Sequence, residues 1–312
     1  MKKVVVTGAN GFIGTALCRK LAQQGGTVIA VVKNEDENVS ALEQIPRLRI
    51  VYCDMALFGR LAQFIPDRDI DAVYHLAWMG SAGPLRGDSG VQTDNIRYTC
   101  DLVKSCADLK CRKIVFASSI MEYEIQALME TERVPGRNTL YSSAKAAANH
   151  MARTMAGEFH LDYIRALLSN VFGPGEKSPR LINTCLRKLL QGEHCAFSSG
   201  EQMYDFIYIE DAVEILAAIG ERGVSNKTYY IGSQNPRPLK EFLYELRDQV
   251  DPGAEIGLGE LPFEGVSLTY REFDINAVKE DTGIVPRVSF SQGIQNTVRW
   301  MKGNKTDESI SD

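Results

Sequence analysis

Short apolar runs alternate with stretches of helical periodicity in the first half of the chain. β-branched and aliphatic residues dominate the short runs, which is typical of strands buried on both faces of a parallel sheet. Between them, apolar positions recur every three or four residues, which indicates amphipathic helices. We expect strands at 4–6, 27–32, 48–54, 71–78 and 112–119, helices at 15–21, 93–109 and 141–159, and a functional loop at 79–90. This alternation predicts an α/β fold with a doubly wound parallel sheet.

Three glycines separate the first strand from the first helix. Gly8, Gly11 and Gly14 fall at every third position. Gly8 permits a tight turn, Gly11 permits the backbone to approach a pyrophosphate, and Gly14 permits close packing of helix on strand. The helix N-terminus presents free N–H groups and a positive dipole end to phosphates. A plain glycine turn is the alternative, but strand, turn and helix in this order predict a dinucleotide site.

The turn reads VTGANGFIG, with the spacing GxxGxxG. This pattern resembles the extended branch of the short-chain dehydrogenase/reductase superfamily, and further motifs of that branch follow in family order from residue 3 to about 302. The resemblance implies a Rossmann domain at 1–168, to which the chain returns later, and a smaller mixed α/β substrate domain mainly at 169–302. The polar residues 303–312 are expected to be disordered.

Composition narrows the possible functions. The chain has 312 residues, 44% of them hydrophobic, as in a globular protein with a sizeable core. With 35 basic and 40 acidic residues the net charge is −5, so we expect no nucleic-acid or membrane partner. No apolar run approaches the ~18 residues that a membrane span needs. The seven cysteines lack a CxxC pair, which favours reduced thiols in a cytoplasmic protein and makes a metal site improbable.

The end of the second strand bears on the choice between NADP and NAD. NAD-selective Rossmann proteins place an acidic residue there that bonds the adenosine ribose. Here Val32 takes that position and Lys33 follows. Because a cation can pair with a 2′-phosphate, we predict NADP. The carboxylates of Glu35, Asp36 and Glu37 in the same loop keep NAD open as the alternative.

The resemblance also implies contacts with the cofactor further along the chain. Asp54 stands where family members place an acidic residue against the adenine amino group, although it could instead cap a helix near Leu57. In the fourth-strand motif HLAW, we expect His75 to be packed rather than catalytic and Trp78 to face the substrate. Asn95 corresponds to an asparagine that steadies the backbone of the site, although a helix asparagine can also face solvent. The implied cofactor-binding residues are Gly8, Gly11, Phe12, Ile13, Gly14, Lys33, Asp54, Met55, Leu76, Ala77, Trp78, Asn95, Tyr141 and Lys145.

A hydroxyl, a phenol and an ammonium are the predicted catalytic groups. Ser119 ends the fifth strand, and open parallel sheets bind ligands beyond the carboxyl ends of their strands. Tyr141 and Lys145 are four residues apart and share a helix face, as a simple surface pair also would. A phenol with a reference pKa near ~10 is a poor base at neutral pH, but a nearby ammonium favours its phenolate. Tyr141 would therefore exchange a proton with the substrate, Ser119 would bond the same oxygen, and Lys145 would hold the nicotinamide ribose.

The two residues after Ser119 limit the types of reaction that the site could catalyse. Nucleotide-sugar 4,6-dehydratases place Asp and Glu there, and decarboxylating relatives need the glutamate, whereas this chain has Ile120 and Met121, which cannot transfer protons. Glu122 is a spare carboxylate that we expect to point away from the site. Simple hydride chemistry remains, with reduction of a 4-keto nucleotide sugar as the main prediction and 4-epimerisation as the alternative. A dinucleotide-sensing regulator is a second alternative, which the intact catalytic set disfavours.

The second half of the chain resembles the substrate-binding part of the extended branch. Asn170 would contact substrate phosphate or cofactor, unless it forms an Asx turn, and Arg180 could reach a diphosphate. Tyr204 stands where the RDxxYVxD motif has the arginine that clamps the diphosphate, so another cation substitutes or the substrate is not a nucleotide-diphosphate sugar. The predicted substrate-binding residues are Ser119, Asn170, Arg180 and Tyr204. Helices near 95–109 and 141–159 form dimer interfaces in relatives, so the resemblance implies a homodimer.

Overall fold

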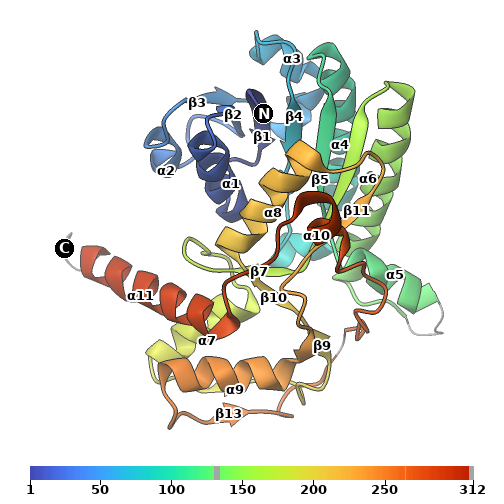
Figure 1. The fold of residues 1–312 in the computed structure, drawn as a ribbon. Coiled ribbons are helices and arrows are strands. Elements are labelled where there is room, and N and C mark those ends of the chain that lie inside the picture. The colour runs from blue at the N-terminus through green and yellow to red at the C-terminus, as the bar shows by residue number, and fades with distance from the viewer. Residues whose placement is uncertain (130–133, 264, 309–312) are drawn as a thin grey trace. The chain divides into compact units, whose positions relative to one another are not determined.

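The computed structural model describes residues 1–129, 134–263 and 265–308. The chain divides into two compact units. The first unit comprises Met1–Leu168, Val213–Ile231 and Asp274–Val285, and the second comprises Ser169–Ala212, Gly232–Phe273 and Pro286–Asp312. The chain therefore leaves the first unit after Leu168 and returns to it twice, which can be followed by colour in Figure 1.

A seven-stranded parallel sheet organises the first unit (Figure 1). Its strands are β1 (Lys3–Thr7), β2 (Thr27–Val32), β3 (Leu48–Tyr52), β4 (Ala72–His75), β5 (Lys113–Ser119), β6 (Asp162–Leu168) and β11 (Thr228–Ile231). They lie in the order β11-β6-β5-β4-β1-β2-β3, and every neighbouring pair is parallel. The order reverses between β1 and β4, and this switch point is where open α/β sheets bind ligands.

Helices and short 3₁₀ turns cover this sheet. They are α1 (Phe12–Gln23), α2 (Ser40–Glu43), η1 (Met55–Arg60), α3 (Leu61–Phe64), η2 (Pro84–Gly87), α4 (Ser89–Asp108), α5 (Glu122–Met129), α6 (Thr139–Glu158) and α10 (Ala277–Thr282). Helix α8 (Ile209–Arg222) begins in the second unit and ends in the first. Helix α6 packs on α4, β5 and β6, and buries Ala148, Ala152 and Ala156, whose small side chains permit a close approach.

The second unit consists of helices and short strand pairs. The helices are α7 (Leu181–Leu190), α9 (Leu239–Val250) and α11 (Phe290–Glu308). The strand pairs are β7 (Asn170–Phe172) with β10 (Phe206–Tyr208), β9 (Met203–Tyr204) with β12 (Arg237–Pro238), and β8 (Cys195–Ala196) with β13 (Ile256–Gly257). Three phenylalanine rings, Phe206, Phe242 and Phe290, pack against one another with centroids 4.8 to 5.6 Å apart.

The predicted parallel sheet is confirmed. The main differences between the predicted and the observed elements concern helices. Helix α4 begins at Ser89 rather than at residue 93, because Asp88 Oδ1 accepts a hydrogen bond from Val91 N (3.0 Å) and caps the helix. Helix α5 is missing from the prediction, since eight residues give little periodic signal. Residues 303–308 continue α11, and the expected disorder of the polar tail stays a prediction. Residues 309–312 lie outside the described part of the chain.

Candidate functional site

The turn between β1 and α1 requires glycine at two positions for different reasons. Gly8 has a φ of +66°, and a Cβ there would lie 2.8 Å from the backbone nitrogen of Ala77, which follows β4. At Gly14 a Cβ would lie 2.9 Å from Ala9 Cα, which would separate α1 from the turn. Gly11 caps α1, whose first turn carries no acidic side chain. The turn therefore presents helix N-terminal N–H groups without a competing carboxylate, which suits a pyrophosphate.

A pocket of about 160 Å³ lies at the carboxyl ends of β1 to β4. Six residues predicted to bind the cofactor line this pocket: Gly8, Lys33, Asp54, Met55, Ala77 and Trp78. Asn10, Val31, Cys53, Phe58 and Met79 complete the lining. Phe12 and Ile13 form the first turn of α1, and Leu76 follows β4. The pocket thus lies at the switch point of the sheet and contains the glycine turn, which is the position where folds of this kind bind a dinucleotide.

Both charge types occur at the end of this pocket nearest β2 and β3. Lys33 is exposed at the rim. Glu37 Oε2 accepts a hydrogen bond from Asn10 Nδ2 (3.1 Å), so a carboxylate also reaches the rim. Asp54 Oδ1 accepts from Ala56 N (2.9 Å) and caps η1, as in the alternative considered for this residue. Its contact with adenine remains a prediction.

His75 is packed inside the first unit. Its Nδ1 lies 2.9 Å from Thr7 Oγ1 and its Nε2 lies 3.1 Å from Thr99 Oγ1. Burial, and next the charge of Lys145, lower the pKa of His75 to about 3. The imidazole is therefore neutral at physiological pH, which agrees with a structural role.

Two amide side chains on α4 hold the segment that follows β4. Asn95 is buried, its Oδ1 accepts from Met79 N (3.0 Å), and its Nδ2 donates to Met79 O (2.9 Å). Gln92 Oε1 accepts from Trp78 Nε1 (3.1 Å), and Gln92 Nε2 donates to Leu85 O (3.0 Å). Asn95 therefore steadies this backbone and does not face solvent. Gln92 is a second anchor that the sequence reasoning missed.

The predicted phenol and ammonium meet at the indole of Trp78. Tyr141 and Lys145 lie on α6 and are 7% and 5% exposed. The ring centroids of Tyr141 and Trp78 are 6.1 Å apart, edge to face. Lys145 Nζ lies 3.8 Å from the Trp78 ring centroid and donates to Ala117 O (2.8 Å) in β5. The fold thus anchors Lys145 near the carboxyl end of β5 and makes the indole of Trp78 the common neighbour of both predicted groups.

Ser119 ends β5, and its backbone is fixed by a carboxylate. Its Oγ accepts from Met121 N (3.2 Å), and its own N donates to Glu122 Oε1 (3.2 Å). Glu122 is 6% exposed. It is therefore not a spare group but a buried and fully engaged one, because the chain turns into α5 directly after the strand.

Glu122 joins β5, β6 and α6. Its Oε1 accepts from Ser118 Oγ, and its Oε2 accepts from Arg165 Nη2 (2.7 Å) and Asn149 Nδ2 (3.3 Å). The sequence does contain a signal that Arg165 has a buried partner, but it does not identify Glu122 as that partner. Arg165 interrupts the apolar strand β6, and a charge at such a position requires a buried partner.

The other predicted substrate-binding residues belong to the second unit. Asn170 begins β7, and its Nδ2 donates to a backbone carbonyl (3.1 Å). Arg180 precedes α7, with its Nε 3.8 Å from Glu176 Oε2. Tyr204 stacks on Phe206, with centroids 5.5 Å apart at 22°. Their roles in substrate binding remain predictions.

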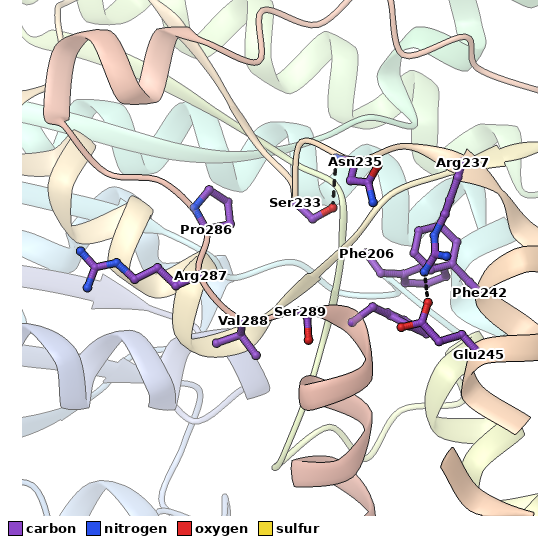
Figure 2. A pocket seen from close by; sticks show the side chains of 11 residues that line it. Phe206, Ser233, Asn235, Arg237, Phe242, Glu245, Pro286, Arg287, Val288 and Ser289 are labelled. Atoms are coloured by element: carbon purple, nitrogen blue, oxygen red, sulfur yellow. Dashed lines mark hydrogen bonds and ion pairs between the residues drawn. The ribbon is translucent and has the colours of Figure 1, made fainter. Parts of the chain in front are cut away.

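The second unit also contains a pocket of about 370 Å³, shown in Figure 2. Phe206, Phe242 and Phe290 form its apolar lining. Arg237 Cζ lies 4.1 Å from the Phe242 centroid, and the guanidinium is ion-paired with Glu245, as the dashed line in Figure 2 marks. This cation is therefore already neutralised by a neighbouring carboxylate.

In the part of the chain that the structure describes, no helix is both long and apolar enough to cross a membrane. No group of three His, Cys, Asp or Glu side chains among the same residues could hold a metal ion. The cysteines are buried free thiols.

Comparison with known proteins gives consistent matches. The model of the NAD dependent epimerase/dehydratase family matches residues 4–232. The dTDP-glucose 4,6-dehydratase of Neisseria gonorrhoeae is 27% identical over 344 residues, which cover 98% of this chain and 97% of the relative.

Solved structures share the fold. A UDP-N-acetylglucosamine 4-epimerase from Methanobrevibacter ruminantium, in complex with UDP-N-acetylmuramic acid, has a TM-score of 0.81 at 21% identity, covering 97% of this chain and 99% of the other. The Bordetella bronchiseptica enzyme WbmF, in complex with NADH, has a TM-score of 0.81 at 20% identity, and the match covers 99% of this chain and 94% of the other.

Proposed function

Because the chain belongs to the NAD dependent epimerase/dehydratase family, we propose that it reduces a 4-keto nucleotide sugar by hydride transfer. One observation carries this proposal. Tyr141 and Lys145 are buried together beside Trp78 at the carboxyl end of β5, where a reacting carbonyl could be protonated. Directly after that strand, Ile120 and Met121 supply no acid or base for elimination or decarboxylation. Hydride transfer with one proton donor is the chemistry that these side chains support.

Each side chain has its own part in the proposed reaction. When bound, the nicotinamide supplies the hydride. Tyr141 donates its phenolic proton to the substrate oxygen, and Ser119 Oγ bonds the same oxygen. Lys145, anchored on Ala117 O, keeps a positive charge close to the phenol and holds the nicotinamide ribose. General acid catalysis of this kind contributes roughly 10²–10⁴-fold.

NADP is the proposed cofactor. The exposed ammonium of Lys33 at the rim of the cofactor pocket supports it, since a 2′-phosphate could pair with this cation without displacing any buried group. Glu37, bonded to Asn10 at the same rim, favours NAD instead, because a carboxylate repels a phosphate and accepts bonds from ribose hydroxyls.

The proposed substrate is a nucleotide sugar bound by a homodimeric enzyme. The names of the relatives support the substrate class. Because Tyr204 carries no charge, the cation that would meet the diphosphate is Arg180. Its Nε lies 3.8 Å from Glu176 Oε2, so it is only loosely paired. The proposed oligomeric state is a homodimer. The apolar side chains of Leu140 and Met151 are exposed on α6, which supports a dimer interface on this helix, and light scattering after gel filtration would test it.

A 4-epimerase is the second candidate. The bond between Glu37 and Asn10 favours it, because an epimerase oxidises and then re-reduces its substrate with one retained cofactor, for which NAD is suited. Such an enzyme would interconvert two sugars without net change in cofactor absorbance.

A screen of 4-keto and 4-hydroxy nucleotide sugars with NADPH and NADH tests the proposal. We expect stoichiometric consumption of reduced cofactor with a 4-keto substrate. Interconversion of 4-hydroxy epimers without net cofactor consumption would establish the epimerase instead. Binding of cofactor with neither reaction would reject both.

A further inference from the structure

We propose that Arg86 is a second cation of the hydride-transfer site, which lies on the ring face of Tyr141 and stabilises its phenolate form. The inference rests on the proposed role of Tyr141 in proton transfer. It gives the segment between β4 and α4, which contains Arg86, a direct part in the proton transfer.

The contact between the two side chains is close. Arg86 Cζ lies 4.0 Å from the centroid of the Tyr141 ring. Ionisation of a phenol spreads negative charge over the ring, so a guanidinium above the face attracts the phenolate more strongly than the phenol. The ring is 7% exposed, so water screens this attraction only weakly.

The fold holds Arg86 in place from both sides. Its Nη1 donates to Ser81 O (3.0 Å) across the turn of η2. The preceding carbonyl, Leu85 O, accepts from Gln92 Nε2 (3.0 Å), and the following carbonyl, Gly87 O, accepts from Arg137 Nε (2.8 Å). The guanidinium is therefore a fixed part of the site and not a mobile surface group.

Charged groups approach Tyr141 from several elements. Within the described chain, Lys145 lies on the same helix and Arg86 on η2, and Arg137 Nε donates to Gly87 O at the end of η2. Glu124 on α5 approaches the next residue along α6, where its Oε2 accepts from Ser142 Oγ (2.7 Å). Lys145 Nζ contacts Ala117 O and the Trp78 ring, and the Arg86 guanidinium lies over the face of the phenol ring.

The molecule contains a matched control. On α4, Arg97 Cζ lies 5.0 Å from the centroid of Tyr98, which is also a guanidinium over a buried phenol. Neither residue belongs to the proposed site. Arg97→Gln therefore removes the same kind of contact without touching the proposed catalytic groups.

Titration of a single phenol tests the inference without any substrate. The near-ultraviolet phenolate absorbance of each protein is recorded against pH, and the curve of the same protein carrying Tyr141→Phe in addition is subtracted to isolate Tyr141. We expect Arg86→Gln to move this difference curve to higher pH by about one unit, a tenfold change in the ionised fraction. Arg86→Lys should restore part of the shift, and Arg97→Gln should leave the curve unchanged. A difference curve that is the same in wild type, Arg86→Gln and Arg86→Lys would overturn the proposal.

The pH–rate profile provides the second measurement. Because removal of a cation disfavours the phenolate, Arg86→Gln should move the acidic limb of the oxidation direction and the basic limb of the reduction direction both to higher pH. A variant that changes only the KM for the sugar would show that Arg86 binds substrate, and would overturn the proposal. If no sugar reacts but the phenol titration shifts as expected, the proposed function fails while the contact between Arg86 and Tyr141 stands.

Discussion

Each unit holds a cation against aromatic rings, but the rings differ in what they can do. In the first unit, Arg86 lies over the phenol of Tyr141, and Lys145 lies over the indole of Trp78. In the second unit, Arg237 lies over Phe242, a hydrocarbon ring packed among other phenylalanines. The ring under Arg86 belongs to a group that can gain or lose a proton, whereas the ring under Arg237 does not.

The carboxylates near the two clusters differ as well. Arg237 is paired with Glu245 and lies 4.0 Å from Glu241, so its charge serves packing within the second unit. In the first unit, the carboxylate of Glu122 is bonded to Arg165 beneath the end of β5. A cation over an aromatic ring is thus a common packing contact. A candidate reaction site is distinguished by a ring that can itself ionise, such as the phenol of Tyr141.

The largest expected effect comes from removal of one oxygen in the first cluster. Tyr141→Phe should lower turnover by roughly 10²–10⁴-fold, because the proton donor is lost while the ring and its contacts remain. Cofactor affinity, measured by fluorescence titration, should stay within about twofold of wild type. Tyr98→Phe on α4 is the control and should retain activity. Normal turnover in Tyr141→Phe would reject the assignment.

The buried ion pair of the first unit should contribute more to stability than the partly exposed pair of the second. Glu122→Ala leaves Arg165 without its partner and should lower the free energy of unfolding by about 3–5 kcal/mol. Glu245→Ala should cost about 1 kcal/mol or less. Urea unfolding measures both. Replacement of Arg165 by Met in the Glu122→Ala background should recover part of the loss, and equal costs for the two single variants would contradict the comparison.

The glycine turn offers a test of close backbone approach. Gly8→Ala should destabilise the protein and abolish cofactor binding, because the new Cβ would lie 2.8 Å from Ala77 N. Gly259 in the second unit also has positive φ (+82°), but no atom of the described residues lies within 4 Å of the place that a Cβ would take, so Gly259→Ala should show backbone strain alone. Thermal unfolding and NADPH titration would separate the two effects. Similar behaviour of both variants would show that packing at Gly8 is unimportant.

The smallest expected effect concerns the cofactor. Lys33→Ala should weaken NADPH binding by about tenfold or less, since the ion pair is at the surface, and should leave NADH binding unchanged. Lys110→Ala, another exposed lysine of the first unit, is the control. A wild-type protein that prefers NADH would defeat the argument for NADP.

Local sequence determined the framework of the first unit. The apolar runs placed β1 to β5, and the glycine spacing located the turn that the backbone conformation of Gly8 requires. The spacing of Tyr141 and Lys145 put them on one face of α6. These features depend on residues that are near one another along the chain, so periodicity and turn chemistry are sufficient to predict them.

Only the tertiary structure decided which distant groups meet. Nothing in the local pattern joins Arg86 to Tyr141, Trp78 to Gln92, or Glu122 to Arg165. The sequence allowed two interpretations of Asn95 and of Asp54. In the structure, Asn95 on α4 bonds the backbone of Met79, and Asp54 caps η1. Such contacts arise because helices and loops from separate parts of the chain pack on one sheet, and each buried polar group must then find its partner in three dimensions.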